Sequence, residues 1–439
     1  MRELTSRGRF GISLGLERIG AILDELDHPE RQLRGALVAG TNGKGSVVAM
    51  VQSVLREAGL RVGTMPKPHL VSYRERIALD GLPIDEADFA AAVGRVLPAV
   101  DRVASRLGAP TEFETLTAAA FSELARRQVD LAVVEVGMGG RLDATNVLDP
   151  GVAVITNVQK DHERYLGSTL AAIGTEKAAI IKPGNLAVTG ATGRGLPPIL
   201  DRCAALAVPL RLAGRTRPYR AELRNQDLRG IVVDAHTPTT TLDELQVGLL
   251  GRHQATNAAV ALAVLDALRQ AAERRGQPLP GLNEEALRRG LAKARWPGRL
   301  ELLEATPHGR VLLDGAHNPA GARALATALE DLQLTGIPMV FGAMRGKRVA
   351  AMLRALASAR TQPVFTAIAD HNGLPPRELL QTWRRVTGAH GGAAADMPTR
   401  ALEMAADLRH DAQQPVLVAG SLYLVGSLRA ELLGEGQPA

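Results

Sequence analysis

The sequence predicts an α/β protein with two mainly parallel sheets in two domains. Short apolar runs, typical of buried parallel strands, alternate with segments of helical spacing over most of the 439 residues. A chain of this length favours two domains, and a second alternating series begins near residue 310. A glycine-rich loop follows the first apolar run and precedes a helical segment, as in nucleotide-binding α/β domains.

The first alternating series is expected to form an amino-terminal domain over residues 1–294, of the P-loop ATPase type. Its predicted strands are 36–39, 130–136 and 152–157, and its predicted helices are 47–58, 169–180 and 255–268. Residues 207–247 are rich in Arg, Thr and short Val runs, with a weak helical signal. We therefore expect a small β subregion there.

The second series is expected to form a smaller, Rossmann-like α/β domain over residues 295–439. Its predicted strands are 310–314, 337–342, 363–366 and 415–419, with helical stretches between them. The boundary is placed at residues 294–299, because the Pro-Gly pair there is typical of a turn or linker.

Composition restricts the classes of function. The chain is 46% apolar and 22% charged, which is ordinary for a globular protein. A formal charge of +6 and a pI near 9.7 have two explanations: an arginine-rich proteome, or attraction of anionic substrates such as ATP and polycarboxylates. Nucleic acid is not an expected partner, because the basic residues are dispersed and aromatics make up only 3% of the chain.

The location expected from the sequence is the cytoplasm, with no membrane association. Cys203 is the only cysteine, which excludes an intrachain disulfide and a thiolate metal cluster and suits a reducing compartment. Helical spacing around it predicts a buried structural thiol. Residues 1–10 lack the apolar stretch of a signal peptide, and no apolar run approaches the roughly 20 residues of a membrane span.

The loop at residues 40–46, Gly-Thr-Asn-Gly-Lys-Gly-Ser, predicts a site for a nucleoside triphosphate. Backbone N–H groups at a helix start attract anions, Lys44 adds a positive charge, and the Ser46 hydroxyl can bind Mg²⁺. The spacing departs from the usual Walker pattern. Two residues separate Gly40 from Gly43, and Gly45 stands between the lysine and the serine.

Acidic and imidazole side chains follow two of the predicted strands. Glu135 lies at the end of one, and Asp161 and His162 follow the next. Ligands of open α/β sheets lie beyond the carboxyl ends of strands, and Mg²⁺ favours oxygen donors with an occasional imidazole. Ser46, Glu135 and His162 are therefore candidates for one metal site. Each taken alone has an ordinary structural alternative, such as a helix cap, an ion pair or a packing role.

Several longer motifs stand in one order between about residues 11 and 427. They are the loop at 40–46, Pro-His-Leu at 68–70, Glu-Val-Gly-Met-Gly-Gly-Arg-Leu-Asp-Ala-Thr-Asn at 135–146, Asp-His at 161–162, Glu-Lys-Ala at 176–178, Leu-Leu-Gly-Arg-His at 249–253, Pro-Gly-Arg at 297–299, Asp-Gly-Ala-His-Asn-Pro at 314–319 and Gly-Ser-Leu-Tyr-Leu-Val-Gly at 420–426. With them the chain resembles folylpolyglutamate synthase, often bifunctional with dihydrofolate synthase, in the Mur ligase superfamily.

The resemblance implies roles for residues at the phosphate end of a site. Those expected to bind ATP are Thr41, Asn42, Gly43, Lys44, Gly45, Ser46, Asn257, Arg299 and Asp314. Ser46 and Glu135 would hold a first Mg²⁺ and His162 a second. Lys177 matches a lysine that is carbamylated in this superfamily, and His317 would lie near the reacting groups; with Lys44, these two are the expected catalytic residues.

The resemblance also implies the substrates. Phe113 and Asp143 match positions that stack on and hydrogen-bond the pterin, although a core aromatic and a turn cap are the structural alternatives. L-glutamate would be joined to a reduced folate, and also to dihydropteroate, through an acyl phosphate made from ATP. A monomer is expected.

Three departures from the family pattern and two rival functions are visible. Lys67 stands where serine is expected, Lys160 where an apolar residue is usual, and Gly-Lys-Arg at 346–348 where Asp-Lys-Asp is common. One rival is another Mur-type amino-acid ligase. A peptidoglycan-type enzyme would need a UDP-binding domain before a loop that starts here at residue 40. The other is a P-loop ATPase that switches a partner.

Overall fold

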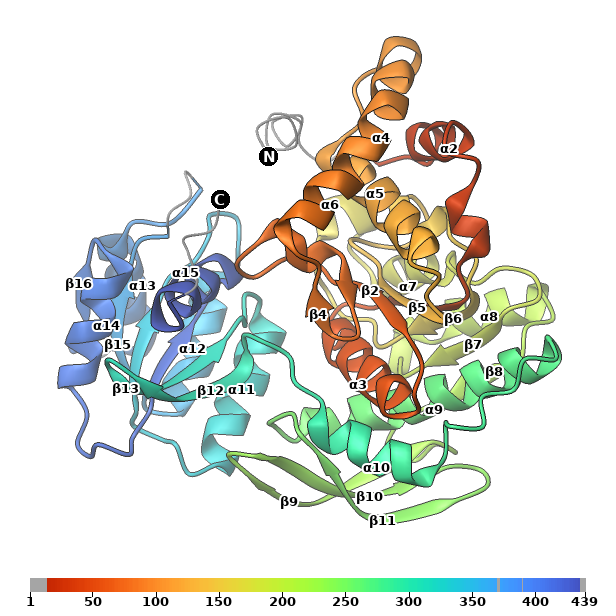
Figure 1. Ribbon diagram of the computed structural model, residues 1–439. Coiled ribbons are helices and arrows are strands. Elements are labelled where there is room, and N and C mark those ends of the chain that lie inside the picture. The colour runs from red at the N-terminus through yellow and green to blue at the C-terminus, as the bar shows by residue number, and fades with distance from the viewer. Residues whose placement is uncertain (1–13, 369–371, 389, 435–439) are drawn as a thin grey trace.

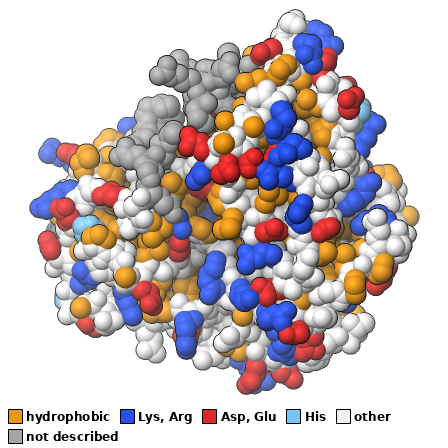
Figure 2. Space-filling view, viewed as in Figure 1, with side chains coloured by type: hydrophobic (Ala, Val, Ile, Leu, Met, Phe, Trp, Pro, Cys, Tyr) orange, Lys and Arg blue, Asp and Glu red, His pale blue; other side chains and the backbone are white. Residues whose placement is uncertain are grey.

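The computed structural model describes residues 14–368, 372–388 and 390–434, so the expectation for residues 1–10 lies outside it. The amino-terminal and carboxy-terminal α/β units lie side by side, with the latter in blue and cyan (Figure 1). Within the described ranges, no helix has the length and apolarity that a membrane crossing requires. Basic and acidic side chains are interspersed on the face shown in Figure 2, as the dispersed charge of the sequence predicts.

The first sheet has eight strands in the order β4-β3-β2-β5-β1-β6-β7-β8. The strands are β1 (Gly35–Ala39), β2 (Val62–Met65), β3 (Ala78–Leu79), β4 (Leu82–Pro83), β5 (Leu131–Glu135), β6 (Gly151–Ile155), β7 (Leu186–Thr189) and β8 (Leu210–Leu212). β3 pairs antiparallel with β2 and β4, and every other pairing in this sheet is parallel. The central strands β5, β1 and β6 therefore end at the same edge.

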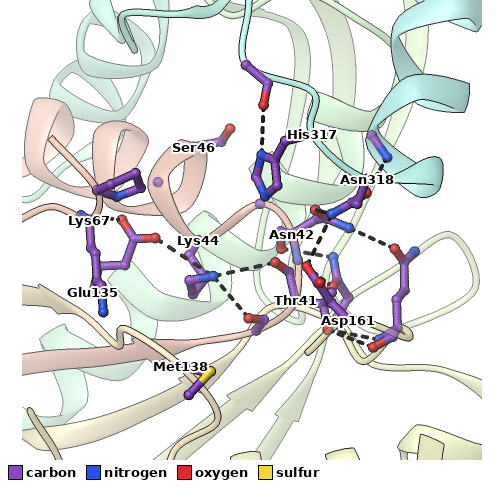
Figure 3. A pocket seen from close by; sticks show the side chains of 18 of the residues that line it. Thr41, Asn42, Lys44, Ser46, Lys67, Glu135, Met138, Asp161, His317 and Asn318 are labelled. Carbon is purple, nitrogen blue, oxygen red and sulfur yellow. Dashed lines mark hydrogen bonds and ion pairs between the residues drawn. The ribbon is translucent and has the colours of Figure 1, made fainter. Parts of the chain in front are cut away.

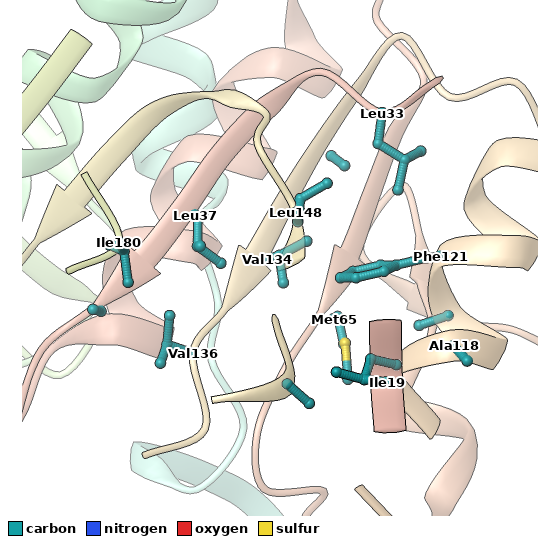
Figure 4. Close-up of a cluster of buried hydrophobic side chains, with 14 of the residues drawn as sticks. Ile19, Leu33, Leu37, Met65, Ala118, Phe121, Val134, Val136, Leu148 and Ile180 are labelled. Carbon is teal, nitrogen blue, oxygen red and sulfur yellow. The ribbon is translucent and has the colours of Figure 1, made fainter. Parts of the chain in front are cut away.

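Alternate residues of the central strands enter two separate cores. Leu37 and Ala39 of β1 belong to the core in Figure 4, whereas Ala36 and Val38 belong to the core on the opposite face. Helices cover both faces, as a parallel sheet requires. They are α2 (Glu17–Asp24), α4 (Glu86–Leu107), α5 (Glu112–Arg126), α7 (Leu170–Ala178) and α8 (Pro197–Ala205) on the first core, and α3 (Lys44–Glu57), α9 (His253–Arg274) and α10 (Glu284–Lys293) on the second. Short turns are η1 (Pro29–Gln32), η2 (Tyr73–Arg76), η3 (Ala144–Val147), α6 (Glu163–Leu166) and η4 (Gly193–Gly195).

The small β subregion is an antiparallel sheet of three strands, drawn in green at the bottom of Figure 1. Its strands are β9 (Arg220–Asp227), β10 (Gly230–His236) and β11 (Thr241–Val247). Ile231, Val233 and Leu245 pack into the second core. The prediction for residues 207–247 is confirmed from residue 220 onward, but β8 pairs in parallel with β7 and belongs to the first sheet.

The carboxy-terminal unit has a six-stranded sheet in the order β12-β13-β17-β14-β15-β16. Its strands are β12 (Arg299–Thr306), β13 (Gly309–Asp314), β14 (Pro338–Phe341), β15 (Gln362–Thr366), β16 (Ala393–Ala395) and β17 (Val416–Ala419). Only β12 pairs antiparallel. One face packs on α11 (Pro319–Asp331), α12 (Val349–Ser358) and α13 (Pro376–Thr387), the other on α14 (Pro398–Asp407) and α15 (Leu422–Leu432). The predicted α/β fold class is confirmed.

Two local expectations change. The helix expected from residue 47 begins at Lys44, because Gly43 takes a left-handed conformation (φ 80°) at its N-cap position and lets the helix start directly after it. Gly45 and Ser46 therefore lie in the first turn of α3. Cys203 is buried as expected, and burial raises the pKa of its thiol to about 11.

Candidate active site

The phosphate loop lies at the point where the strand order of the first sheet reverses. The chain leaves β1 toward β2 on one side and later crosses β1 to build β6, β7 and β8 on the other. The loop follows β1, Glu135 ends β5, and residues 156–162 follow β6. Ligands of open α/β sheets bind at such a switch point, so the topology gathers the candidate residues in one place.

Three glycines of the loop are surrounded so closely that no side chain fits. A Cβ built on Gly40 would lie 1.8 Å from Thr156 Oγ1, and one on Gly43 would lie 2.5 Å from Asn257 Oδ1. A Cβ on Gly45 would lie 2.6 Å from the indole ring of Trp296. The unusual Gly45 of the loop thus makes room for a tryptophan from the segment between the two sheets.

Side chains after β6 fix the rest of the loop, as Figure 3 shows in part. Asn42 N donates to Asn157 Oδ1 (3.0 Å), and Asn42 O accepts from Thr156 Oγ1 (2.7 Å) and Asn157 Nδ2 (2.9 Å). Thr41 Oγ1 donates to Gln159 O (3.1 Å) and accepts from Gln159 N (3.0 Å). The loop is held in one shape, which favours a preformed anion site.

Half-buried Lys44 and buried Glu135 form an ion pair that lines the cavity. Lys44 Nζ donates to Gly40 O (3.1 Å) and Thr41 O (3.4 Å) and lies 3.8 Å from Glu135 Oε1. Glu135 is 4% exposed, and Oε2 accepts from Lys67 N (3.2 Å). Burial raises the pKa of Glu135, and Lys44 opposes this shift. Lys44 is too far from Glu135 for a hydrogen bond, so the charge of this buried carboxylate is only partly neutralised. Such a carboxylate is suited to binding a cation.

Ser46 and Asn257 are linked through Gln254, which the sequence did not single out. Gln254 Nε2 donates to Ser46 Oγ (3.3 Å), and Gln254 Oε1 accepts from Asn257 Nδ2 (2.8 Å). Both α9 residues lie against the start of α3. The structure places Asn257 against the phosphate loop; its contact with adenine or ribose stays a prediction.

The remaining metal candidate, His162, lies in the same cavity. It takes a left-handed conformation (φ 48°) before α6, and its side chain is 41% exposed. Burial lowers its pKa, and Lys347, Lys44 and Lys177 lower it further while Asp161 opposes them. A neutral imidazole can act as a ligand. No cluster of three acidic, imidazole or thiol groups that could hold a metal exists among the described residues. A hydroxyl, a carboxylate and an imidazole are donor types that a divalent cation accepts, and metal binding by Ser46, Glu135 and His162 stays a prediction.

Lys177 is a buried amine without a partner. It lies in α7, is 3% exposed, and has no hydrogen-bond or ion-pair partner for Nζ among the described residues. Burial, and then Lys44, lower its pKa to about 7. A neutral amine facing a cavity is nucleophilic enough to react with CO₂.

The carboxy-terminal unit supplies the opposite wall. Asp314 is 9% exposed, and its two oxygens accept from Leu300 N (3.0 Å) and Ala316 N (2.9 Å). Burial raises its pKa, and Arg299 opposes the shift. His317 Nδ1 lies 2.8 Å from Gly315 O, so the assigned tautomer donates from Nδ1 and leaves Nε2 to accept. Burial, and then Arg299, lower the pKa of His317 to about 4.

Asn318 connects the two units (Figure 3). Its Oδ1 caps α11 by accepting from Gly321 N (2.8 Å). Its Nδ2 donates to Asn42 Oδ1 (3.4 Å) and to Asp161 Oδ2 (3.3 Å) in the amino-terminal unit. The N-terminus of α11 is thereby aimed at the phosphate loop.

Phe113 and Asp143, the predicted pterin residues, also line the cavity. Lys67 Nζ is 3.7 Å from the centroid of the Phe113 ring. Asp143 caps η3, because Oδ1 accepts from Thr145 N (3.1 Å) and Thr145 Oγ1 (2.6 Å), and Oδ2 accepts from Met138 N (2.8 Å). The capping alternative is therefore present in the structure, and the contact of Asp143 with a pterin stays a prediction.

The structure brings every predicted site residue to one cavity of about 1310 Å³ between the two units. The three departures from the family pattern differ in whether they line this cavity. Lys67 and Lys347 line this cavity, whereas Lys160 is exposed and pairs with Glu163 (3.5 Å). The sequence missed Gln254, Trp296, Asn318 and Arg76 as site residues.

Comparisons with known proteins agree with this architecture. The Mur ligase middle domain family matches residues 38–265, and the dihydrofolate synthetase C-terminal domain family matches residues 301–432. The chain is 33% identical to a dihydrofolate synthase/folylpolyglutamate synthase of Bacillus subtilis, over 97% of this chain and 96% of that one.

Two solved structures are similar over nearly the whole chain. One is Escherichia coli FolC in complex with DHPP and ADP, with a TM-score of 0.83 and 29% identity over 99% of this chain and 97% of that one. The other is a bifunctional folylpolyglutamate synthase/dihydrofolate synthase of Yersinia pestis complexed with AMPPNP and an Mn ion. It has a TM-score of 0.82 and 30% identity over 96% and 94%.

A parallel sheet with this phosphate loop, facing a second α/β unit across the cavity, defines a Mur ligase. Within that class, the chain belongs to the folylpolyglutamate synthase/dihydrofolate synthase family.

Proposed function

We propose that this protein is an ATP-dependent ligase that adds L-glutamate to tetrahydrofolate, as a folylpolyglutamate synthase, and also to 7,8-dihydropteroate, as a dihydrofolate synthase. One observation carries the proposal: a rigid phosphate loop and the predicted pterin residues Phe113 and Asp143 line one cavity, and the second unit closes that cavity with Asp314 and His317. A cytoplasmic monomer is the form we expect to act.

The first chemical step joins the substrate carboxylate to the γ-phosphate of ATP. A carboxylate oxygen attacks phosphorus, the bond to the β-phosphate oxygen breaks, and ADP leaves. Lys44 and the N–H groups at the start of α3 stabilise the charge on the transferring group. Ser46 and Glu135 would hold one Mg²⁺ and His162 a second. These ions would neutralise phosphate charge.

The second step forms the amide. The amino group of L-glutamate attacks the acyl carbon, phosphate leaves, and the nitrogen loses a proton. His317 is neutral at pH 7 and presents Nε2 as an acceptor, so it would orient the attacking amine. Coupling to ATP is needed because a carboxylate is a poor acyl donor. Enclosure by both units protects the acyl phosphate from water.

Carbamylation of Lys177 is part of the proposal. The neutral Nζ would attack CO₂ and lose a proton, which converts a would-be cation into an anion beside the phosphate site. Its isolation from other polar groups and its pKa of about 7 support this chemistry.

The test is incubation with ATP, Mg²⁺ and L-glutamate, offering dihydropteroate and tetrahydrofolate separately, with products weighed by mass spectrometry. Addition of one glutamate residue to both acceptors is expected. ATP turnover that is indifferent to glutamate and to both acceptors would favour the P-loop switch. Glutamate addition to another carboxylate alone would favour a different Mur-type ligase.

A further inference from the structure

Lys67 places an amine in the cavity, over the Phe113 ring. Its backbone follows β2 and is fixed by the hydrogen bond to Glu135 (3.2 Å), while Nζ lies over the Phe113 ring at 3.7 Å. A Cβ built on Gly137 would lie 2.3 Å from Nζ, so the amine occupies space that only glycine leaves open. Nζ forms no hydrogen bond or ion pair with the described residues and lies against the ring face.

Arg76 lines the same cavity and forms no ion pair with a described residue, although Glu112 lies near enough to oppose the lowering of its pKa by burial. The residue is 7% exposed. Its Nε donates to His69 Nδ1 (3.0 Å), but Nη1 is buried with no hydrogen-bond partner among the described residues. A buried guanidinium N–H left unsatisfied is costly, and such groups are normally paired. The wall is therefore built to receive an anion.

Several charged groups act on Lys67 and Arg76. Burial lowers the pKa of Lys67 to about 8; Asp143 opposes this shift, and Arg76 and Lys44 add to it. Glu135 acts on both Lys67 and Arg76. Lys67 itself reaches from Glu135, which accepts from its backbone N, to Phe113, which lies under its Nζ. Asp143 has both oxygens engaged with Met138 and Thr145, so it does not form a close pair with Lys67.

We propose that Lys67 and Arg76 bind the carboxylate that receives the phosphoryl group, in a substrate whose aromatic head stacks on Phe113. This inference rests on the proposed function, and it assigns the residues that would position the substrate carboxylate for attack on ATP. Two anions must meet in the first step, and cations beside the nucleophile reduce their repulsion. The family resemblance leads one to expect serine at residue 67, so in this proposal Lys67 is a specificity-determining residue.

One structural alternative uses the same contact. Lys67 could simply cover the Phe113 ring, so that an aromatic head must displace it. The flexible stem of lysine permits such a displacement in either case. The two roles differ in their dependence on the charge of the ligand: carboxylate binding requires a charged probe, whereas covering the ring weakens every probe that stacks.

The experiment compares equilibrium binding of pteroate with that of its uncharged carboxamide. Wild type is expected to prefer pteroate by about tenfold or more, as for a charge-assisted hydrogen bond, and Lys67→Met to lose about tenfold of that preference. Lys293→Met, an exposed lysine paired with Glu57, is the matched control and should keep the wild-type preference.

Other outcomes overturn the inference. A preference unchanged in Lys67→Met shows that the charge is not used, and equal strengthening of both probes shows that Lys67 covers the ring. A wild type that ligates glutamate to dihydropteroate but binds both probes equally refutes this inference alone. A wild type that binds neither probe and ligates neither acceptor refutes the proposed function with it.

Discussion

The indole of Trp296 lies directly against Gly45, at 2.6 Å from the position where a Cβ would be. Trp296 precedes the first strand of the carboxy-terminal unit, and Gly45 is the residue of the phosphate loop that lies in the first turn of α3. The residue that breaks the Walker spacing is thus the contact point between the loop and the segment that joins the two sheets.

Gly45→Ala is expected to weaken ATP binding and to destabilise the protein by about 1–3 kcal/mol, because the rigid ring must move. Thermal unfolding and ADP titration measure both effects. Gly94→Ala, in α4 with nothing within 4 Å of its Cβ, is the control and should be stabilising by about 0.5–1 kcal/mol. Trp296→Ala combined with Gly45→Ala should bind ADP better than Gly45→Ala alone. Wild-type affinity in Gly45→Ala would contradict the coupling.

Lys177→Ala is expected to abolish ligation, with partial recovery on addition of short carboxylic acids that replace the carbamate. Product formation measured by mass spectrometry, with and without acetate, checks this. Full activity in the variant without added acid would refute the carbamate.

Lys177 should also leave a signature in the pH dependence of stability. Its folded pKa of about 7 lies below the ordinary 10.5, so the unfolded chain binds more protons between these values. Stability therefore rises with pH over this window. The difference in unfolding free energy between wild type and Lys177→Met, followed by denaturant titration in CO₂-free buffer, should grow in favour of wild type from pH 7 to 10. A flat difference would contradict a buried neutral amine.

Glu135→Gln is expected to raise the stability of the unliganded protein, on the order of 1 kcal/mol, and to lower kcat by about 10²-fold. Burial raises the pKa of Glu135, which means that its charged form destabilises the fold at neutral pH, and an amide removes that cost. Mn²⁺ binding should weaken in parallel. Glu57→Gln, which loses surface ion pairs with both Arg289 and Lys293, should change stability little and leave Mn²⁺ binding intact.

Asn318→Asp separates helix capping from the contact between the units. Aspartate caps as well as asparagine does, so stability should stay near that of wild type, whereas Asn318→Ala should lose about 1 kcal/mol. The new carboxylate would face Asp161, 3.3 Å from the lost amide nitrogen, and repel it. A raised KM for ATP is therefore expected in both variants. A KM changed only in Asn318→Ala would assign the effect to the cap.

Much of this site was predictable because its residues follow strands or stand in long motifs. The loop, Glu135, His162 and Asp314 each follow or end a strand, and their convergence follows from the parallel sheet. The start of α3 was predicted three residues late, since the left-handed Gly43 begins the helix inside a loop-like sequence. Strand β12 was missed because its residues are largely half-buried and give no continuous apolar run.

Gln254 and Arg76 were missed for a different reason. Gln254 reaches Ser46 across 208 positions, and a contact of that kind leaves no local pattern in either segment. Arg76 sits in a charged stretch, Tyr-Arg-Glu-Arg, that predicts a solvated turn. Only its burial without an ion pair to a described residue distinguishes it.

The amide of Asn318 reaches back 276 positions to Asn42. During translation, the phosphate loop is therefore synthesised long before Asn318, the residue that joins the loop to the second unit. Trp296, the other such contact, also comes late. Because a ligand stabilises only the state that binds it, ATP adds little to an emerging chain and most to a nearly finished one. ATP would thus stabilise a newly made chain only after both units have folded and come together.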